Sequence, residues 1–468
     1  MLLGESRLAT ALAQAAKRSP ADETLLAAQR GSFTTLRFAG GKIHQNFHEE
    51  DITVWVKVAA AGRMGVATTC SIGRESLERA VAGAMTIVKM TAPATKIGGS
   101  VRHRTLADGK QVAPAFSVTP PKEPTLELTT HFPQTLHEPF SEIVGKIRGL
   151  WRCSEKLGMG LAGSFVRGEE ELAVVGSGGL VQYQPFSVAG LRLVATEGKA
   201  SGFAAQVSRD LKTLDFDALA KRAWDFCRKN KNPQPIPIGK YDVLLEPEAV
   251  AELLEWLGAI GFGAKQMVER TSFMAGRIGQ RIMHRSISII DDGTDSQGLA
   301  APFDYEGVPK RRVPLIQGGV AQNVVYDSHY AKLHHRSSTG HALSFNEFEG
   351  PLAGNLFMEK GTTPYKELLP MMDRGLWICR FHYVSGLLKT QEALMTGLTR
   401  DGTFLIKNGK VAEAVKNLRF TQSILEAFSR VAAVSRERRL IADPSQGLSA
   451  AVCPALLIKN FTFTGQTQ

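Results

Sequence analysis

Cysteine is scarce in this sequence and widely scattered. The five cysteines are odd in number and include no Cys-x-x-Cys pair; they are Cys70, Cys153, Cys227, Cys379 and Cys453. This pattern excludes a disulfide framework and a cysteine-rich metal site. It favours a reducing compartment, and we expect a cytoplasmic protein.

Long apolar runs are also absent. No stretch of 18 apolar residues occurs, so we expect no membrane-spanning helix. Residues 8–16 are rich in alanine, but Glu5 precedes Arg7 where a signal peptide would carry a positive region. We interpret this segment as an amphipathic first helix, with a signal peptide as the alternative.

Negative charge is outnumbered, with 45 Asp and Glu against 56 Lys and Arg, for a net charge of +11. The densest basic runs, 310–312 and 436–439, have none of the interleaved aromatic residues that stack on bases. We therefore expect a solvated basic face with weak attraction to polyanions, and no specific nucleic-acid site.

The length of 468 residues predicts two or three domains, each with its own core. Residues 93–135 are rich in Pro, Thr, Gly and Lys, and residues 231–239 alternate prolines, which favours an extended spacer. The predicted units are an N-terminal α+β unit (1–92), a linker or surface excursion (93–135), a second α+β unit (136–230), a Pro-rich spacer (231–239) and a C-terminal β-rich domain (240–468).

The first 230 residues contain one pattern twice: strands around a glycine turn, then a helix. In the first copy we expect strands at 33–39, 52–59 and 66–70 and a helix at 75–89. In the second we expect strands near 171–175, 179–185, 190–195 and 203–207. Its helix, 216–228, should have Asp215 as N-cap.

The last 230 residues predict one long helix among many short strands. The helix should begin at Pro247, whose missing N–H costs nothing in the first turn, and run to about residue 260. A second helix is expected near 421–431, and strands at 241–245, 286–290, 313–317, 320–326, 376–383, 404–407, 410–415 and 456–464. The fold class is therefore α+β, with N-terminal duplicated hairpin–helix units and a C-terminal β-rich mixed domain.

Four motifs of the C-terminal half occur in a characteristic order. They are Ser-Phe-Met-Ala-Gly-Arg-Ile-Gly (272–279), Asp-Asp-Gly-Thr (291–294), Pro-Phe-Asp-Tyr-Glu-Gly-Val-Pro (302–309) and Ser-Ser-Thr-Gly-His (337–341). With segments 315–320, 374–376 and 404–410, they resemble the TldD/PmbA family of metallopeptidases, also called modulators of DNA gyrase. The resemblance covers most of the chain and is densest from about residue 240.

The resemblance implies a metal-binding helix that this chain has altered. TldD-type members carry His-Glu-x-x-x-His there, with two metal-ligating histidines and a glutamate as general base. The corresponding stretch here places Glu255, Trp256 and Ile260 at those three positions, and no histidine lies between His137 and His284. The pattern resembles the PmbA/TldE branch, which implies no catalytic residue and no metal in this chain, and zinc or iron in a TldD-type partner.

The family's cysteine near the C-terminus is the remaining element of that site. Residues 440–443 occupy its place here, and Cys453 lies later, as a cysteine does in PmbA/TldE-type members. A thiol nucleophile, Cys379 or Cys453 with a histidine, is an alternative, but both lie in apolar strands, which favours buried inert thiols.

Other polar clusters have two interpretations each. His329, His334, His335 and His341 fall within 13 residues and could bind a metal, yet their spacing matches no ligand motif, which favours exposed or strand-terminal histidines. Asp291-Asp292 before Gly293 is more typical of a tight turn than of an acid/base pair. By resemblance, backbone contact with a peptide is expected at Ser338, Thr339, Gly340 and His341.

The resemblance implies a PmbA/TldE-like subunit that pairs with a TldD-type chain and acts on peptides or unfolded proteins. It would shape the substrate channel, by adding strand edges to an extended peptide. The alternative is a homodimeric binding or adaptor protein with no proteolytic role. A third reading is an autonomous peptidase that uses the histidines of 329–341.

Overall fold

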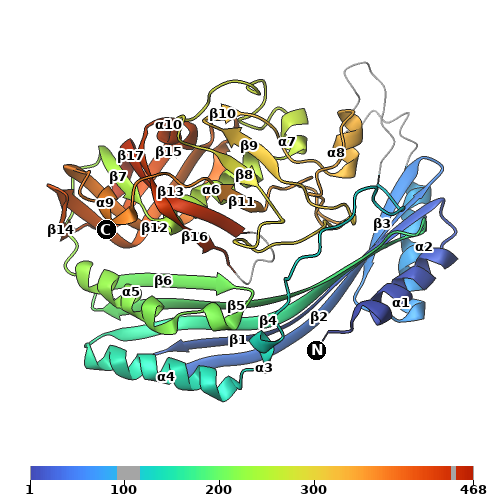
Figure 1. Ribbon diagram of the computed structural model, residues 1–468, viewed down its shortest axis with the longest axis horizontal. Helices are drawn as coiled ribbons and strands as arrows, with labels where there is room; N and C mark the ends of the chain where they lie inside the picture. The colour runs from blue at the N-terminus through green and yellow to red at the C-terminus, as the bar shows by residue number, and fades with distance from the viewer. Residues whose placement is uncertain (1, 92–115, 444–449, 467–468) are drawn as a thin grey trace.

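The chain folds around two sheets that face each other (Figure 1). The structure is a computed structural model that describes residues 2–91, 116–443 and 450–466, so the predicted linker 93–135 lies partly outside the described residues. The lower sheet has six strands in the order β3-β2-β1-β4-β5-β6. They are β1 (Glu23–Ala39), β2 (Lys42–Ala60), β3 (Arg63–Thr69), β4 (Gly160–Gly176), β5 (Val181–Glu197) and β6 (Ala200–Ser208).

The six-stranded sheet contains the predicted duplication. Each half has three antiparallel strands followed by a helix, and the halves join where β1 pairs with β4. The helices are α1 (Glu5–Arg18) and α2 (Arg74–Met90) on one half, and α3 (Gln134–His137), α4 (Phe140–Lys156) and α5 (Phe216–Lys229) on the other, with a 3₁₀ turn at Leu211–Thr213. The Asp215 carboxylate accepts from the backbone N–H of Ala218 at 2.9 Å, which confirms the predicted N-cap.

Strands of the second half are longer than predicted. The expected breaks within 171–195 reduce to one turn, so that two 17-residue strands, β4 and β5, replace three short ones. Residues 186–189, where a break was expected, instead continue β5 and pair with residues 167–170 of β4, where Gly168 makes room for Phe33 of β1. A Cβ at Gly168 would lie 2.2 Å from the ring of Phe33. The helix Phe140–Lys156 was not predicted.

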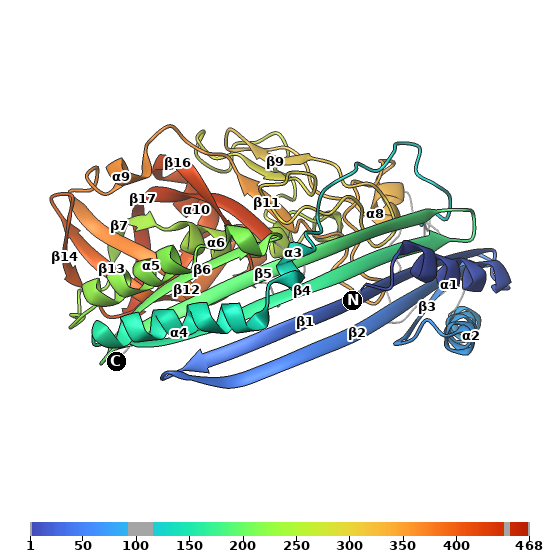
Figure 2. The same cartoon turned by 60° about the horizontal axis from the view of Figure 1, so that its bottom comes forward.

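Alternation along β1 decides what each face of the sheet contacts. Leu26, Ala28 and Leu36 point to one face, where helices α1, α2, α4 and α5 cover the core. Leu25 and Ala27 point to the other face and pack with Ala301 and Phe303 of the C-terminal half. Figure 2 shows the long hairpins β1–β2 and β4–β5 running the length of the molecule beneath that half.

The C-terminal half is built on an eleven-stranded mixed sheet. Its strands are β7 (Lys240–Leu245), β8 (Ile289–Asp291), β9 (Val313–Gln317), β10 (Val320–Ala321), β11 (Asn355–Met358), β12 (Arg374–Lys389), β13 (Leu394–Lys407), β14 (Lys410–Ala414), β15 (Leu418–Ser423), β16 (Val431–Ile441) and β17 (Ala450–Gln466). Its helices are α6 (Pro247–Gly261), α7 (Ala264–Val268), α8 (Ser328–Leu333), α9 (Tyr365–Leu368) and α10 (Ile424–Ser429), with a 3₁₀ turn at Thr390–Glu392.

Helix α6 begins at Pro247 as predicted and is the most buried helix of this half. Leu253, Leu254 and Leu257 are fully buried in its core. Two further differences concern the strands: β16 was not predicted, and the strand expected at 320–326 is only Val320–Ala321. Within the described residues, no helix has the length and apolar character needed to cross a bilayer.

Candidate functional site

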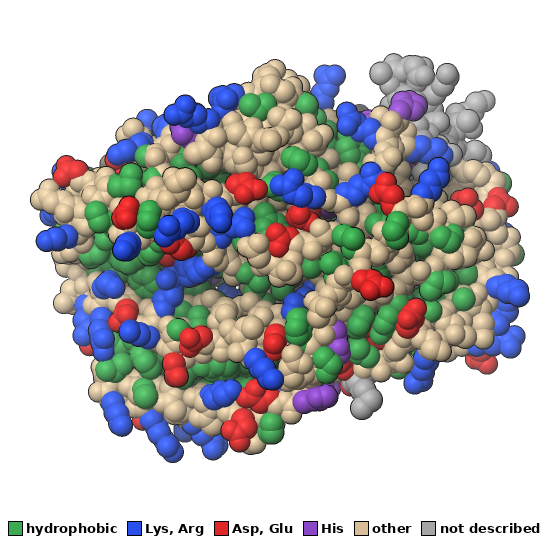
Figure 3. All heavy atoms as spheres, in the orientation of Figure 1, with side chains coloured by type: hydrophobic (Ala, Val, Ile, Leu, Met, Phe, Trp, Pro, Cys, Tyr) green, Lys and Arg blue, Asp and Glu red, His purple; other side chains and the backbone are tan. Residues whose placement is uncertain are grey.

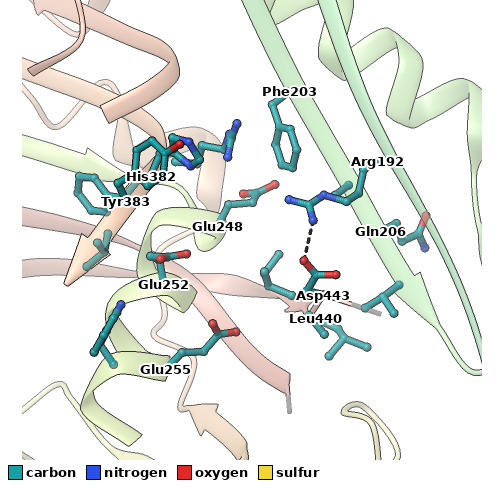
Figure 4. Close-up of a pocket in the computed structure, with 18 of the residues that line it drawn as sticks. Arg192, Phe203, Gln206, Glu248, Glu252, Glu255, His382, Tyr383, Leu440 and Asp443 are labelled. Atoms are coloured by element: carbon teal, nitrogen blue, oxygen red, sulfur yellow. Dashed lines mark hydrogen bonds and ion pairs between the residues drawn. The ribbon is translucent and has the colours of Figure 1, made fainter. Parts of the chain in front are cut away.

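A cavity of about 520 Å³ lies where the two halves face each other. Figure 3 shows this face of the molecule hollowed between them. The walls come from β5 and β6 on one side and from α6, β12 and the end of β16 on the other (Figure 4). Residues that matter below are Arg192, Phe203, Gln206, Glu248, Glu252, Glu255, Trp256, Ala259, Arg380, His382, Tyr383, Leu440 and Asp443.

One face of helix α6 supplies the acidic wall. Glu248, Glu252 and Glu255 are spaced by four and three residues, which places them on one stripe of a helix, opposite the buried leucines. Trp256 lies beside them, and its ring packs against the backbone of Gly386 on β12. Burial of the opposite face in the core therefore fixes which residues face the cavity.

The first turn of α6 is held by a buried ion network. Arg222 of α5 and Arg439 of β16 contact Glu246 at 2.8 and 2.9 Å, and Arg439 also contacts Glu248 at 2.7 Å. Trp377 donates its indole N–H to Glu246 at 2.8 Å, and Tyr365 donates its hydroxyl to the same carboxylate. Burial opposes ionisation of Glu246, but the two arginines outweigh it and lower its pKa. These carboxylates are structural.

Glu252 and Glu255, one and two turns further along, have no such partners. Neither makes a hydrogen bond or ion pair in the described part of the chain. Burial in the cavity raises the pKa of Glu252, which Arg380 and Arg192 partly offset. Burial, with the nearby carboxylates of Glu252 and Asp443, raises the pKa of Glu255 to about 7.

The opposite wall is joined to this site by an ion pair. Arg192 of β5 contacts Asp443, just after β16, at 2.7 Å (Figure 4). The same two residues line a second cavity of about 420 Å³, which continues over the sheet toward β1 and β2. Among its other lining residues are Phe33, Thr35, Arg37, Phe47 and Glu49. The two cavities therefore adjoin at the Arg192–Asp443 pair.

The metal site that the family resemblance implies does not fit the residues at the corresponding positions. Trp256 and Ile260 offer no ligand atom, and Ile260 is buried away from the cavity. Glu255 alone presents a carboxylate. Within the ranges that the structure describes, no three His, Cys, Asp or Glu side chains are arranged to hold a metal ion. The absence of a metal from this chain remains a prediction.

The two cysteines considered as nucleophiles are both buried. Cys453 donates its thiol to the carbonyl of Pro247 at 3.2 Å, and burial raises its pKa far above the usual range. Burial likewise raises the pKa of Cys379. Neither thiol lines the cavity formed by α6 and β5. Residues 440–443, by contrast, do line it, beside the altered helix.

His334 and His341 of the 329–341 segment bond to different partners. His341 is fully buried, not exposed, and its Nε2 contacts a carboxylate oxygen of Asp291 at 2.7 Å. Burial lowers the pKa of His341 despite that carboxylate. His334 instead contacts the hydroxyl of Tyr326 at 3.1 Å. These bonds tie the segment to its own domain.

Most polar groups of 338–341 bond locally. Ser338 and Thr339 both donate their hydroxyls to the carbonyl of Tyr326, and Gly340 has a φ of +74° where a Cβ would meet the backbone of Pro309. Ser338 also lines a separate cavity of about 370 Å³. Peptide contact here stays a prediction.

The acidic pair at 291–292 divides between two roles. Asp292 accepts from the backbone N–H of Thr294 at 2.9 Å, as the predicted turn requires. Asp291 is instead a buried strand residue that accepts from His341 and from the N–H of Asn355.

Several cavity residues were missed at the sequence level. Glu252 carried a usable signal, since acidic residues spaced at 248, 252 and 255 interrupt an otherwise apolar helix. Arg192 and Tyr383 carried none, because strand residues reach the cavity only through the packing of distant segments.

Comparison with known families identifies two matching regions. Residues 26–88 match the model for PmbA/TldA metallopeptidase domain 1, and residues 238–465 match that for the PmbA/TldA metallopeptidase C-terminal domain. Together these segments cover more than half of the chain.

Curated relatives share a quarter or so of their residues with this chain. An uncharacterised protein of Methanocaldococcus jannaschii is 28% identical over 220 residues, which is 46% of this chain and 50% of that protein. A metalloprotease TldD homolog of Buchnera aphidicola is 26% identical over 242 residues, 51% of this chain and 49% of the other. The chain thus spans about half the length of the curated relatives it matches.

Solved structures match over almost the whole length. TldE from Thermococcus kodakarensis superposes with a TM-score of 0.81 at 20% identity, covering 95% of this chain and 97% of that one. A putative modulator of a DNA gyrase from Thermotoga maritima gives 0.79 at 18%, covering 94% and 96%. At these identities the likeness establishes the fold.

Proposed function

The chain belongs to the TldD/PmbA family, and from this premise we propose that it is a TldE-like, non-catalytic subunit of a cytoplasmic, TldD-type metallopeptidase that acts on peptides or unfolded proteins. The partner subunit would hold the zinc or iron. This chain would bind and orient an extended peptide along the two adjoining cavities.

The observation that carries this proposal is the composition of the α6 face. The helix that carries the metal in TldD-type members lies against this cavity. At its two ligand positions this chain has Glu255, a single carboxylate, and Ile260, which is buried in the core, and Trp256 stands at the general-base position. A cavity with aromatic, acidic and basic walls suits polypeptide binding better than hydrolysis by this chain alone.

Individual residues have distinct parts in the proposed channel. Trp256 and Tyr383 offer aromatic surface to a peptide side chain. The Arg192–Asp443 pair separates the two cavities and can exchange its bond for peptide amides and carbonyls. When a partner supplies the metal, its role is to activate water; the residues described here position the peptide and limit access of bulk water.

The test uses the purified full chain and a fluorescein-labelled, unstructured 15-residue peptide. We expect saturable binding by fluorescence anisotropy and an intact peptide by mass spectrometry. Trp256→Ala should raise Kd about tenfold, since it removes an aromatic contact of about 1.4 kcal/mol. Phe348→Ala, at a side chain 84% exposed outside the two cavities, is the matched control and should leave Kd unchanged.

Two results would count against the proposal. Chelator-sensitive cleavage by the chain alone would make it an autonomous peptidase, and the histidines of 329–341 would be the next residues to vary. Absence of peptide binding would favour the adaptor protein.

A further inference from the structure

A further cavity, of about 460 Å³, lies beyond the end of α6 and outside the proposed peptide channel. Its lining comes from α7 and the segment that follows it, with Gln391 from the 3₁₀ turn after β12. That segment belongs to the motif 272–279, which the channel leaves without a role. We call this cavity the arginine cavity, and its lining includes Met267, Arg270, Phe273, Ala275, Gly276 and Arg277.

One part of the arginine cavity is apolar and held in place by the core. Phe273 is 1% exposed, and a Cβ at Gly261 would lie 2.0 Å from its ring, so the ring packs where the end of α6 has glycine. Met267 and Ala275 extend this apolar surface. Because the core fixes Phe273, a ligand meets a preformed apolar surface, as is usual for binding pockets.

Two arginines in the same lining have unpaired guanidinium groups. Arg270 is exposed and Arg277 is half-buried, and neither guanidinium makes a hydrogen bond or ion pair within the described ranges. Glu269 and Glu392 are next to lining residues in the sequence, but neither lines the cavity, and Glu392 contacts Lys389 at 2.6 Å. The lining therefore carries two positive charges and no negative one.

A backbone N–H group adds to this positive lining. The N–H groups of Ala275 and Arg277 donate to carbonyls of the same loop at 3.2 and 3.0 Å, whereas that of Gly276, between them, has no acceptor in the part of the chain that the structure describes. Gly276 has a φ of +73°, and a Cβ there would meet nothing within 4 Å, so the space beside it is open. Turns with a left-handed residue form concavities of N–H groups that bind anions.

The lining indicates which class of ligand fits. A guanidinium group donates two parallel hydrogen bonds to a carboxylate or a phosphate. The apolar surface beside the arginines favours an anion that has an apolar group next to its charge. The last residue of a peptide combines the two, because its carboxylate and its side chain are on the same carbon. Inorganic phosphate has no apolar part.

We propose that the arginine cavity binds the C-terminal carboxylate of a peptide, with the last side chain against Met267 and Phe273. The cavity lies close to the peptide channel. Ala259 lines the first cavity, and its carbonyl accepts from the side-chain amide of Gln266, the residue before Met267, at 3.4 Å. The inference rests on the proposed function, since it requires that the chain binds peptides, and it adds a preference for peptides with a free C-terminus.

The test compares two forms of the fluorescein-labelled 15-residue peptide, with the label at the N-terminus, leucine at the end and no Asp or Glu. One form has a free C-terminal carboxylate, and the other has a C-terminal amide. Fluorescence anisotropy with the full wild-type chain at low salt should give a Kd about tenfold lower for the acid, because hydrogen bonds to a charged group are strong. The difference should shrink at high salt, which screens exposed charges.

Variants of the two arginines localise the effect. Arg270→Gln and Arg277→Gln should each raise the Kd of the acid about threefold and leave that of the amide unchanged, and the double variant should bind both forms alike. Arg285→Gln removes an exposed arginine outside the cavity and is the matched control, which should keep the wild-type preference. Circular dichroism checks folding, and the wild-type comparison decides alone if a variant does not fold.

Three results would overturn the inference: equal Kd values for acid and amide, a preference that survives the double variant, or stronger competition by inorganic phosphate than by chloride of equal ionic strength. Equal Kd values that still rise in Trp256→Ala would leave the proposed function standing. A preference for the acid that needs both arginines but is unchanged in Trp256→Ala would refute the proposed channel and leave the carboxylate site standing. Failure of both forms to bind would overturn both proposals.

Discussion

Glutamates at the start of α6 and glutamates further along the same helix differ in their ion pairing and in the direction of their pKa shifts. Glu246 and Glu248 are buried against Arg222 and Arg439, and the pKa of Glu246 is lowered. Glu252 and Glu255 face the cavity, and their pKa values are raised. Glu246 and Glu248 link α6 to α5 and β16 through the two arginines, whereas Glu252 and Glu255 face the cavity, where a ligand can reach them. Carboxylates on one helix thus have separate structural and functional roles, decided by which cations the other elements bring.

Removal of the Glu246 carboxylate, which is bonded to two arginines, should have the largest effect on the free energy of unfolding. Glu246→Ala leaves two arginines facing a buried site with one acceptor fewer, and truncation of one member of a buried ion network costs about 3–5 kcal/mol. Urea unfolding at pH 7 measures the loss. Glu367→Ala, at an exposed side chain of α9, should change the free energy of unfolding by less than about 0.5 kcal/mol. A loss as small as the control's would mean that the network is not structural.

Removal of one cation should cost less, because the other remains. Arg439→Gln keeps a polar side chain but shortens it and ends the ionic bonds to Glu246 and Glu248, and we expect the free energy of unfolding to fall by about 1.5–3 kcal/mol. In the same unfolding experiment, Arg439→Gln combined with Glu246→Ala should lose less than the sum of the two, since they share partners. Additive losses would show that the two residues act separately.

Neutralising Glu255, a carboxylate that faces the cavity, should have the smallest effect on the free energy of unfolding. It should raise that free energy, whereas the two changes above lower it. The folded pKa of Glu255, about 7, lies above its ordinary value of 4.5. Its folded state therefore binds protons more tightly, and this contribution to stability is lost as pH rises from about 4.5 to 7. Glu255→Gln should match the wild type near pH 4.5 and exceed it above pH 7, by less than about 1 kcal/mol because solvent reaches the side chain.

Glu246 gives the contrasting pH profile. Because its folded pKa is lowered, its contribution is present above the ordinary value of 4.5 and is lost as pH falls further. Glu246→Gln should therefore be less stable than the wild type at neutral pH, and this difference in free energy of unfolding should shrink in acid. Glu255→Gln should be more stable than the wild type at neutral pH, and that difference should also shrink in acid. Parallel profiles for the two variants would remove the distinction between the two ends of the stripe.

Local chemistry made much of the fold predictable. Pro247 marked the start of α6, Asp215 the start of α5, and helical spacing the apolar faces of both. Strand lengths were less predictable. Residues 186–189 carry no pattern that shows they continue β5, and Gly168 lies within β4 because the ring of Phe33 packs against it.

The site was predictable only where the chain's own helix forms it. Glu255 and Trp256 line the cavity, whereas Ile260, at about 140° of helix rotation from Glu255, is buried in the core. Arg192, His382 and Tyr383 lie on β5 and β12, which form hairpins with strands adjacent in sequence, and they reach α6 only because the two halves of the molecule pack together. No local pattern marks such residues.

The most direct test of the central claim is the transition-metal content of the purified full chain, measured by elemental analysis per mole of protein. We expect close to none, because Glu255 and Ile260 stand at the positions of the two ligating histidines and Ile260 has no ligand atom. About one zinc or iron per chain would contradict it, and would place the catalytic metal of the family in this subunit.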